Sequence, residues 1–218
     1  MSALPPYLSL SERIWYYAFR ILCGAIFFFL VFPLVVIIPL SFNAVPFFTF
    51  TKEMLAFDPA GYSLKWYEDF FTNLNWQGAV QNSVIIAIFS TLISTTLGTL
   101  AALGLSRAQM PYRTLIMSIL ISPMIVPLII SAAGMFFFYS RIGIQGTHIA
   151  VILAHAALGT PFVVITVTAT LSGFDNNLIR ASSSLGAPPS TTFFRVIVPL
   201  ITPGVISGAL FAFITSFD

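Results

Sequence analysis

The stretch Arg180-Ala181-Ser182-Ser183-Ser184-Leu185-Gly186-Ala187-Pro188-Pro189 is the longest polar interval in the second half of a very apolar chain. The residues just before it, 175–177, are Asp-Asn-Asn and offer the side-chain oxygens that cap a helix N-terminus. Gly186 stands where a glycine commonly ends a helix, and the two prolines after it prevent the helix from resuming. The sequence therefore predicts a short helix, a firm stop, and a second helix that Ser190 caps and that re-enters an apolar segment.

The composition of the chain excludes a water-soluble globular protein. Of its 218 residues, 58% are hydrophobic and only 7% are charged, whereas soluble domains carry roughly 25% charged residues. Water cannot solvate such a surface, so we expect an integral membrane protein embedded in a lipid bilayer. The net charge of +2 comes from scattered basic residues and gives no nucleic-acid-binding surface. The single cysteine, Cys23, excludes an internal disulfide.

Five apolar segments are each long enough to cross a bilayer as a helix that rises about 1.5 Å per residue. A cleaved signal peptide is an alternative for the first segment, but the apolar core there exceeds the roughly 7–15 residues of a signal peptide. The sequence therefore predicts an all-α, polytopic transmembrane helical bundle. It has at least five spans in residues 21–218, after an N-terminal segment at 1–20. The expected spans are residues 21–42, 80–105, 114–139, 148–171 and 199–217.

One face of the second segment carries small residues at four-residue spacing. Small residues let two helix backbones approach closely in a membrane, and hydroxyl groups among them can form hydrogen bonds across the interface. The sequence therefore predicts a helix-packing face made of Ser90, Ser94, Gly98 and Ala102.

Prolines interrupt the third and fourth segments: Pro123 and Pro127 in the third, and Pro161 near the middle of the fourth. A proline inside a membrane helix frees backbone carbonyls that can line a cavity, so these residues mark a candidate translocation path. The alternative is that the prolines only shape helix packing. Asp218 is a further candidate, because a carboxylate at membrane depth is costly and usually functional. Alternatively, Asp218 lies at the outer membrane interface.

Motifs for catalysis, nucleotide binding and metal binding are missing from the sequence. Neither of the two lysines, Lys52 and Lys65, stands in the Gly-Lys-Ser/Thr context of a P-loop. Neither His148 nor His155 has zinc-protease spacing, and the Gly-x-Ser-x-Gly motif is absent. We therefore expect no catalytic residue, no metal and no cofactor, and we expect each histidine to satisfy a local hydrogen bond.

The polar interval resembles the cytoplasmic EAA loop of binding-protein-dependent ABC importer permeases. That motif reads Glu-Ala-Ala, three residues, Gly, nine residues, Ile, one residue, Leu-Pro. Aligned on Gly186, the chain matches outright at Ala181 and Pro199, and it carries conservative replacements at Val196 and Val198.

Two positions depart from the motif. Ser182 replaces the second alanine, which is a mild change, and Arg180 replaces the glutamate, which reverses a charge. We therefore expect Arg180 to face an acidic partner, and we expect two non-identical permeases with different loops.

The resemblance implies a non-enzymatic permease subunit whose coupling loop covers about 173–198. It also implies an assembly of two permease subunits, two cytoplasmic ATP-binding subunits that hydrolyse ATP, and an extracytoplasmic solute-binding protein. The loop helix would dock in a groove of an ATP-binding subunit and transmit its closure to the spans. The residues that the resemblance assigns to this coupling are Arg180, Ala181, Ser182, Leu185, Gly186, Ala187 and Pro199.

A second resemblance concerns the solute. The run Ser63-Leu64-Lys65-Trp66-Tyr67, followed by Phe70-Phe71, resembles the extracytoplasmic segment of polyamine-type permeases. This resemblance implies transport of a polyamine or a related small organic solute. An ordinary amphipathic helix at the membrane interface explains the same residues equally well.

The lysines and arginines predict the orientation in the inner membrane. With the N-terminus in the cytoplasm, six of these residues lie inside and three lie outside, which the positive-inside rule favours. The same orientation places the coupling loop in the cytoplasm. With five spans the C-terminus would face outward, and because the family usually has at least one more span, we expect the chain to be truncated. The inside residues are Arg13, Arg20, Arg107, Arg113, Arg180 and Arg195, and the outside residues are Lys52, Lys65 and Arg141.

Two other classes of protein remain as alternatives. A secondary transporter or channel that is not coupled to an ATPase would need ion-coupling carboxylates within spans two to four. A membrane-embedded enzyme would need His, Asp or Glu residues clustered at one depth. The sequence carries neither pattern.

Overall fold

The computed structural model describes residues 9–107 and 109–217. All the elements in these ranges are helices, which confirms the all-α class; an isolated antiparallel bridge joins Asn43 to Tyr62. The chain divides into two compact units, Met1–Gln77 and Gly78–Asp218, and each is described by itself.

The first unit is dominated by one long helix, α1 (Leu10–Leu40). A capping box begins it, because the Glu12 amide donates to Ser9 Oγ at 3.4 Å and the Ser9 amide donates to Glu12 Oε2 at 2.8 Å. The helix starts before the apolar segment predicted at 21–42 and continues through Pro33 and Pro39. None of its residues is buried.

The segment after α1 is organised by the buried side chain of Asn43. Its amide nitrogen donates to the carbonyls of Phe47 at 2.9 Å and Thr49 at 2.7 Å, and its Oδ1 accepts the Val45 amide at 3.0 Å. The indole N–H of Trp66 donates to the Asn43 carbonyl at 2.8 Å, which connects this loop to α3. The short helices of this segment are α2 (Lys52–Leu55), the 3-10 turn η1 (Pro59–Gly61) and α3 (Lys65–Thr72).

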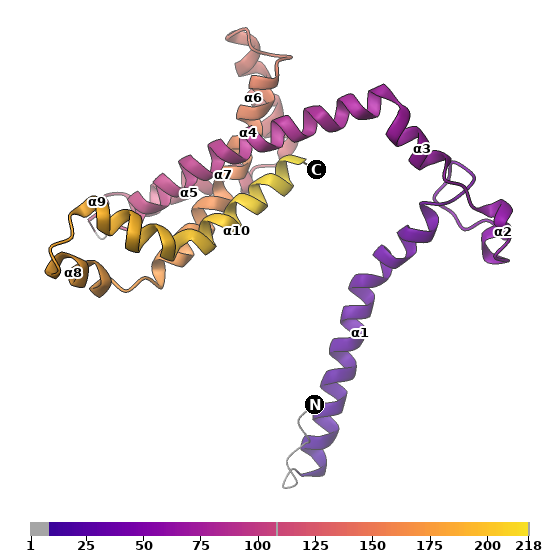
Figure 1. Cartoon of the computed structure of the whole chain (residues 1–218), viewed down its shortest axis with the longest axis horizontal. Coiled ribbons are helices and arrows are strands. Elements are labelled where there is room, and N and C mark those ends of the chain that lie inside the picture. The colour runs from indigo at the N-terminus through magenta and orange to yellow at the C-terminus, as the bar shows by residue number, and fades with distance from the viewer. Residues whose placement is uncertain (1–8, 108, 218) are drawn as a thin grey trace. The chain divides into compact units, whose positions relative to one another are not determined.

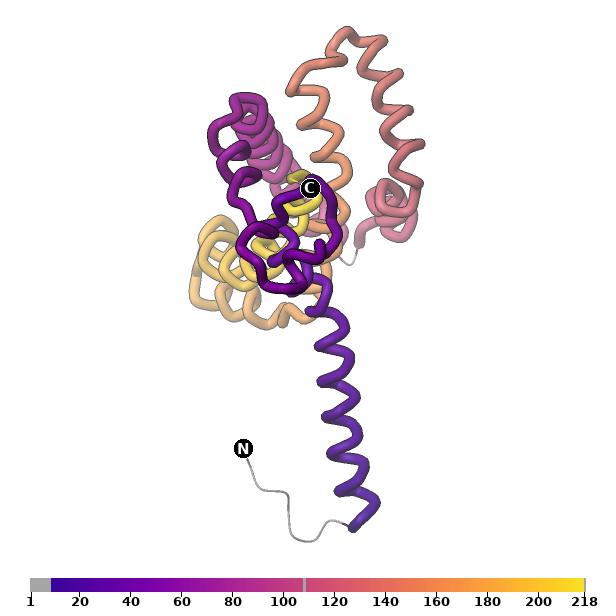
Figure 2. The backbone as a smooth tube through the Cα atoms, turned by 90° about the vertical axis from the view of Figure 1, so that its right-hand side faces the viewer, coloured from indigo at the N-terminus to yellow at the C-terminus, as the bar shows by residue number. Residues whose placement is uncertain are grey.

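The second unit is a helical bundle in which α4, α7 and α10 lie together (Figure 1). Figure 2 shows α6 and α7 running in opposite directions, joined by the turn between them. The elements of the bundle are α4 (Leu74–Leu105), α5 (Arg113–Ile125), α6 (Leu128–Arg141), α7 (His148–Ser172), α8 (Asn177–Ser184), α9 (Pro189–Thr192), the π-helical turn η2 (Phe193–Ile197) and α10 (Val198–Phe217).

Small residues bring these three helices into close contact. A Cβ added at Gly98 of α4 would lie 2.6 Å from the Cβ of Val163 on α7, and one added at Gly208 of α10 would lie 2.7 Å from the Val163 Cα. Neither position has room for a side chain. The predicted packing face is confirmed, because all four of its members are buried: Ser90, Ser94, Gly98 and Ala102.

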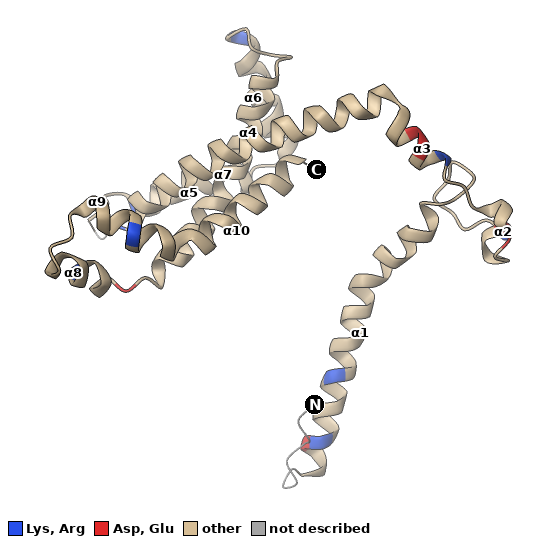
Figure 3. Cartoon of the chain, viewed as in Figure 1, with Lys and Arg blue, Asp and Glu red and all other residues tan. Residues whose placement is uncertain are grey.

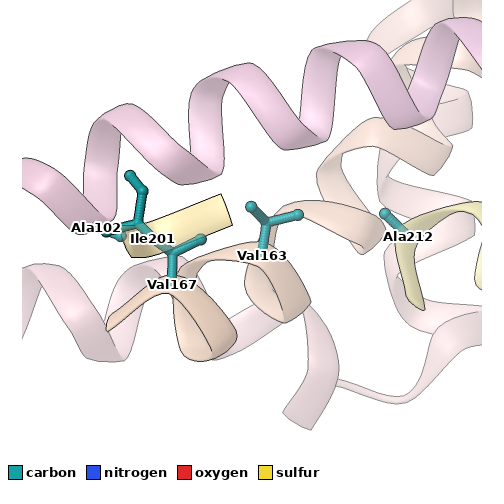
Figure 4. Packing of buried hydrophobic residues seen from close by; sticks show 5 residues of the cluster. All are labelled: Ala102, Val163, Val167, Ile201 and Ala212. Atoms are coloured by element: carbon teal, nitrogen blue, oxygen red, sulfur yellow. The ribbon is translucent and has the colours of Figure 1, made fainter. Parts of the chain in front are cut away.

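Small aliphatic side chains fill the centre of this packing (Figure 4). Helix association in a membrane rests on such van der Waals packing and not on a hydrophobic driving force. The bundle core therefore depends on shape more than on apolar area. Its buried members are Ala102 from α4, Val163 and Val167 from α7, and Ile201 and Ala212 from α10.

Length and hydropathy allow four helices to cross a membrane, or up to five if the bent pair α5 and α6 forms one span. The four are α1, α4, α7 and the continuous helix Pro189–Phe217, which joins α9, η2 and α10 and begins well before the predicted boundary at 199. The third predicted span is not straight, because α5 and α6 meet at 101°.

Candidate functional site

The short helix predicted at the polar interval is α8, and a Schellman motif ends it. The Gly186 amide donates to the Ser183 carbonyl at 3.0 Å, and the Ala187 amide donates to the Ser182 carbonyl at 3.1 Å. Gly186 has a φ of +77°, which confirms the predicted helix stop. A Cβ added there would meet nothing within 4 Å, so the backbone conformation, and not close packing, accounts for the glycine.

The start of α8 is capped by one of the three residues predicted for that role. Asp175 Oδ1 accepts the Asn177 amide at 2.9 Å. Asn176 occupies the N-cap position but makes no capping bond with its side chain. Asp175 therefore supplies the capping oxygen, and the side chains of Asn176 and Asn177 do not.

A buried hydrogen bond closes the loop between α8 and α9. The hydroxyl oxygens of Ser182 and Thr192 lie 2.7 Å apart, and both residues are buried. An alanine at 182, as in the family motif, could not make this bond. The departure from the motif at Ser182 therefore adds a contact that holds α8 against α9.

One face of α8 leaves apolar side chains in contact with solvent. Leu178, Ala181 and Leu185 follow one another at spacings of three and four, which places them on one side of the helix, and all three are exposed. Leu185 is 88% exposed. Arg180 is exposed as well, on the polar side of the same helix. Within the described chain this face has no cover, which is typical of a surface that receives a partner.

The chain re-enters the bundle through α9, which begins at Pro189 and not after Ser190. The prediction that Ser190 caps this helix is wrong, because Pro188 takes the N-cap position and Pro189 suits the first helical position. The helix then widens into the π turn η2 and continues as α10. Pro199 lies exposed in the first turn of α10.

The helix break in the third predicted span falls at Pro127. Val126 before it is extended, as residues before proline usually are, and α6 starts directly after it. Pro123 lies inside α5 and does not end it. The Ile119 carbonyl, which loses its amide partner because residue 123 is a proline, accepts the Ser122 hydroxyl at 2.7 Å.

The predicted break in the fourth span is wrong. Helix α7 is continuous through Pro161, which is fully buried. Asp218, the last candidate for the translocation path, lies outside the described residues. A cavity of about 370 Å³ does lie between α6 and α7, and its lining includes Leu128, next to Pro127, and Leu158, one turn before Pro161. The role of the three prolines in translocation therefore stays a prediction.

A polar cluster inside the bundle escaped the sequence reading. His155 Nδ1 lies 2.9 Å from Ser216 Oγ and 3.1 Å from the Ser216 carbonyl oxygen, and Ser90 Oγ donates to Ser216 Oγ at 2.8 Å. Three helices, α4, α7 and α10, meet at these groups. The four-residue spacing placed Ser90 on the predicted packing face. No local pattern could pair Ser216 with His155, 61 positions away, or with Ser90, 126 positions away.

The three helices that form the centre of the bundle carry no acidic residue, lysine or arginine. Asp, Glu, Lys and Arg do not occur in α4, α7 or α10 (Figure 3). The second histidine, His148, lies at the start of α7 with Nε2 3.2 Å from Asn82 Oδ1. Each histidine thus makes the local hydrogen bond that was expected of it.

Comparison with known proteins identifies the fold and the family. Residues 94–218 match the family described as "Binding-protein-dependent transport system inner membrane component". The chain is 30% identical over 193 residues to the spermidine/putrescine transport system permease protein PotC of Haemophilus influenzae, which covers 88% of this chain and 72% of that protein. It is 30% identical over 194 residues to PotC of Escherichia coli K12, with 89% and 70% covered.

The structural comparison leads to the same fold. A bacterial ABC transporter involved in the import of the acidic polysaccharide alginate superposes with a TM-score of 0.68 at 17% identity, over 97% of this chain and 74% of that one. Together with the apolar helices, these matches describe a multi-pass protein of the inner membrane. The chain belongs to the family of binding-protein-dependent inner membrane components and is a permease subunit of an ABC importer.

Proposed function

We propose that this permease pairs with a second, non-identical permease subunit to form the translocation path for a polyamine or a related small organic solute. An extracytoplasmic solute-binding protein delivers the solute. Two cytoplasmic ATP-binding subunits drive the cycle by hydrolysing ATP, and the permease itself is not an enzyme. The alternative of a transporter without an ATPase loses support from the family to which the chain belongs.

The observation that carries the coupling proposal is the construction of α8. It presents the exposed residues Leu178, Ala181 and Leu185 on one face, and both ends of the helix are fixed by hydrogen bonds. An apolar helix face suits a hydrophobic groove on a partner. We assign that groove to the ATP-binding subunit.

The Ser182–Thr192 hydrogen bond gives the coupling a route into the membrane. When ATP binding closes the two ATP-binding subunits, α8 moves with the surface to which it is docked. The buried bond to α9 transfers this displacement to the continuous helix Pro189–Phe217, which packs along α7. The bundle then alternates between outward-facing and inward-facing states.

The polyamine assignment rests on the relatives. Two proteins that are 30% identical to this chain over nearly nine-tenths of its length are spermidine/putrescine permeases. The run at Ser63–Tyr67, which resembles polyamine-type permeases, agrees with this assignment. The alginate importer shares only the fold at 17% identity, so its solute carries no weight here.

Docking can be tested by placing one carboxylate on each side of α8. Leu185→Asp introduces a charge into the apolar face, whereas Ser183→Asp introduces the same charge on the opposite side of the same helix. We expect Leu185→Asp to remove most of the ATP-binding subunit that copurifies with the permease, while Ser183→Asp retains it. Equal retention of the ATP-binding subunit by both variants would refute the docking face.

The solute can be tested by uptake. In a strain that lacks this gene, the wild-type permease should restore accumulation of radiolabelled putrescine or spermidine in an ATP-dependent manner. Restored growth or transport with a different solute class, and no polyamine uptake, would refute the assignment while leaving the permease role intact.

A further inference from the structure

The geometry points to His155 as a specificity-determining residue that accepts a hydrogen bond from the amino group of the solute inside the α6–α7 cavity. This inference rests on the proposed polyamine function and adds a residue and an atom to it. Nothing in the sequence motifs marks this position.

The cavity between α6 and α7 has a volume of about 370 Å³, and its lining is mostly apolar. Phe136, Tyr139 and His155 bring rings to it, and Gln145 brings an amide. None of the described residues that line the cavity is charged. An aliphatic chain with a polar end fits such a lining better than a sugar or an inorganic anion does.

The contacts of His155 with Ser216 on α10 indicate which ring nitrogen carries the proton. Nδ1 lies 3.1 Å from the carbonyl oxygen of Ser216, and a carbonyl oxygen can only accept a hydrogen bond. In the neutral ring, Nδ1 therefore carries the proton and donates it, with the Ser216 hydroxyl oxygen at 2.9 Å as a second acceptor. It follows that Nε2 carries the lone pair. The bond to α10 thus fixes both the tautomer and the orientation of the ring.

The Nε2 lone pair of His155 suits a ligand that donates hydrogen bonds. An ammonium group has donors and no acceptor, so it complements a lone pair. Phe136 and Tyr139 also line the cavity, and aromatic rings attract a cation. A cavity without a carboxylate binds a cation weakly, and a conduction path requires weak binding because the solute must leave again. The expected ligand is a primary amine at the end of an aliphatic chain.

The test uses two amide replacements that each keep one side of the imidazole. Asn places its amide near the Nδ1 position and can keep the bond to Ser216, whereas Gln reaches the Nε2 position and can keep the acceptor. Phe keeps the ring volume and loses both. Initial rates of putrescine uptake, normalised to the amount of each variant in the membrane, are measured in cells that lack the chromosomal gene.

We expect His155→Phe and His155→Asn to lower the rate about tenfold, which is the loss of one hydrogen bond to a charged group, and His155→Gln to stay within about threefold of the wild type. His148→Phe is the matched control, because it removes the other histidine of α7, which does not line the cavity. It should transport as the wild type does.

The possible results distinguish an error in the proposed solute from an error in the proposed role of His155. If the wild type does not take up putrescine, the proposed solute is wrong. If the wild type transports putrescine and His155→Asn does so equally well while His155→Gln does not, then His155 only ties α7 to α10 and the solute contact is refuted. Full activity of His155→Phe would refute it as well.

Discussion

Gly186 shows how one residue can be required by backbone geometry alone. Its φ of +77° lies in the left-handed region, yet the space around a Cβ there is empty. The two Schellman hydrogen bonds need this conformation, because they turn the chain back over the end of α8. A side chain at this position would therefore strain the turn without touching any neighbour.

The substitution series Gly186→Asn, Gly186→Ala and Gly186→Val should reduce transport in that order. Asn tolerates the left-handed region. The Cβ of Ala adds about 1–2 kcal/mol of conformational strain there, and the β-branched Val adds the most. The strain would redirect the turn and displace α8 while leaving the membrane helices intact. Solute uptake and membrane abundance are measured together. Equal uptake by the Val and Asn variants at normal abundance would show that the positive φ has no role in transport.

Arg180 reverses the charge of the family's glutamate and is exposed on α8. A glutamate near a helix N-terminus gains roughly 0.3–1 kcal/mol from the helix dipole, which an arginine forgoes. We propose that an acidic group on the ATP-binding subunit compensates. Arg180→Glu should weaken copurification of that subunit, and reversal of the acidic partner should restore it. Arg141→Glu, at the predicted outer side, is the control, and undiminished binding by Arg180→Glu would contradict the pairing.

For single residues, the sequence predicted local backbone geometry but not the hydrogen bonds between residues that are far apart in the chain. Gly186 followed by Ala-Pro-Pro is a local pattern, and the structure has the predicted stop. The Ser182–Thr192 and His155–Ser216 bonds join residues on different helices, so they become visible only when the helices are packed. The bond from the Trp66 indole to the Asn43 carbonyl, 23 positions apart, is a third pairing between distant residues.

Between elements, prolines differ in their effect on the helices that hold them. Pro161 lies in α7, which buries seven residues against its neighbours, and the helix stays continuous. Helices α5 and α6 bury none, and the chain bends by 101° beside Pro127. Helix α1 continues through Pro33 and Pro39, and α5 continues through Pro123, although neither helix buries a residue, so a proline does not by itself end a helix. The sequence could therefore place the prolines but could not decide which one breaks a helix.

The packing between α4 and α7 predicts opposite effects for two glycines of one helix. At Gly98, a Cβ would come within 2.6 Å of the Val163 side chain and 3.2 Å of the Thr160 carbonyl, whereas at Gly104 it would meet nothing within 4 Å. Gly98→Ala should destabilise the bundle by about 1–3 kcal/mol, as overpacking does. Gly104→Ala should be neutral or slightly stabilising. Thermal unfolding of both purified variants in one detergent measures the difference, and equal melting temperatures would contradict the close contact.

For the molecule as a whole, the distribution of charge carries the orientation. In the described part of the bundle unit, charged residues are absent from α4, α7 and α10 and lie in short segments between or beside these helices, where the positive-inside comparison applies. We propose that the N-terminus and the α8 loop are cytoplasmic. The family supports an inner-membrane location but leaves the direction open.

Cysteine labelling tests this orientation. Ser184→Cys and Thr72→Cys are made separately in a Cys23→Ser background, because Cys23 is exposed and would react. Both new positions are exposed. A membrane-impermeant thiol reagent added to intact cells should modify position 72 only, and position 184 should react after the cells are opened. Labelling of position 184 from outside would refute the proposed orientation.

The π-helical turn Phe193–Ile197 has a consequence for how loop and membrane helix are aligned in rotation. Successive residues in an α-helix are about 100° apart around the axis, and a π turn holds one residue more than an α turn. If this turn closed as an α turn without losing a residue, the extra residue would swing α9, with α8 bonded to it, around the axis of α10 by about 100°. The side of the α10 axis on which Leu185 lies therefore depends on whether this turn is π or α, and a switch between the two conformations would rotate the coupling loop without any change in sequence.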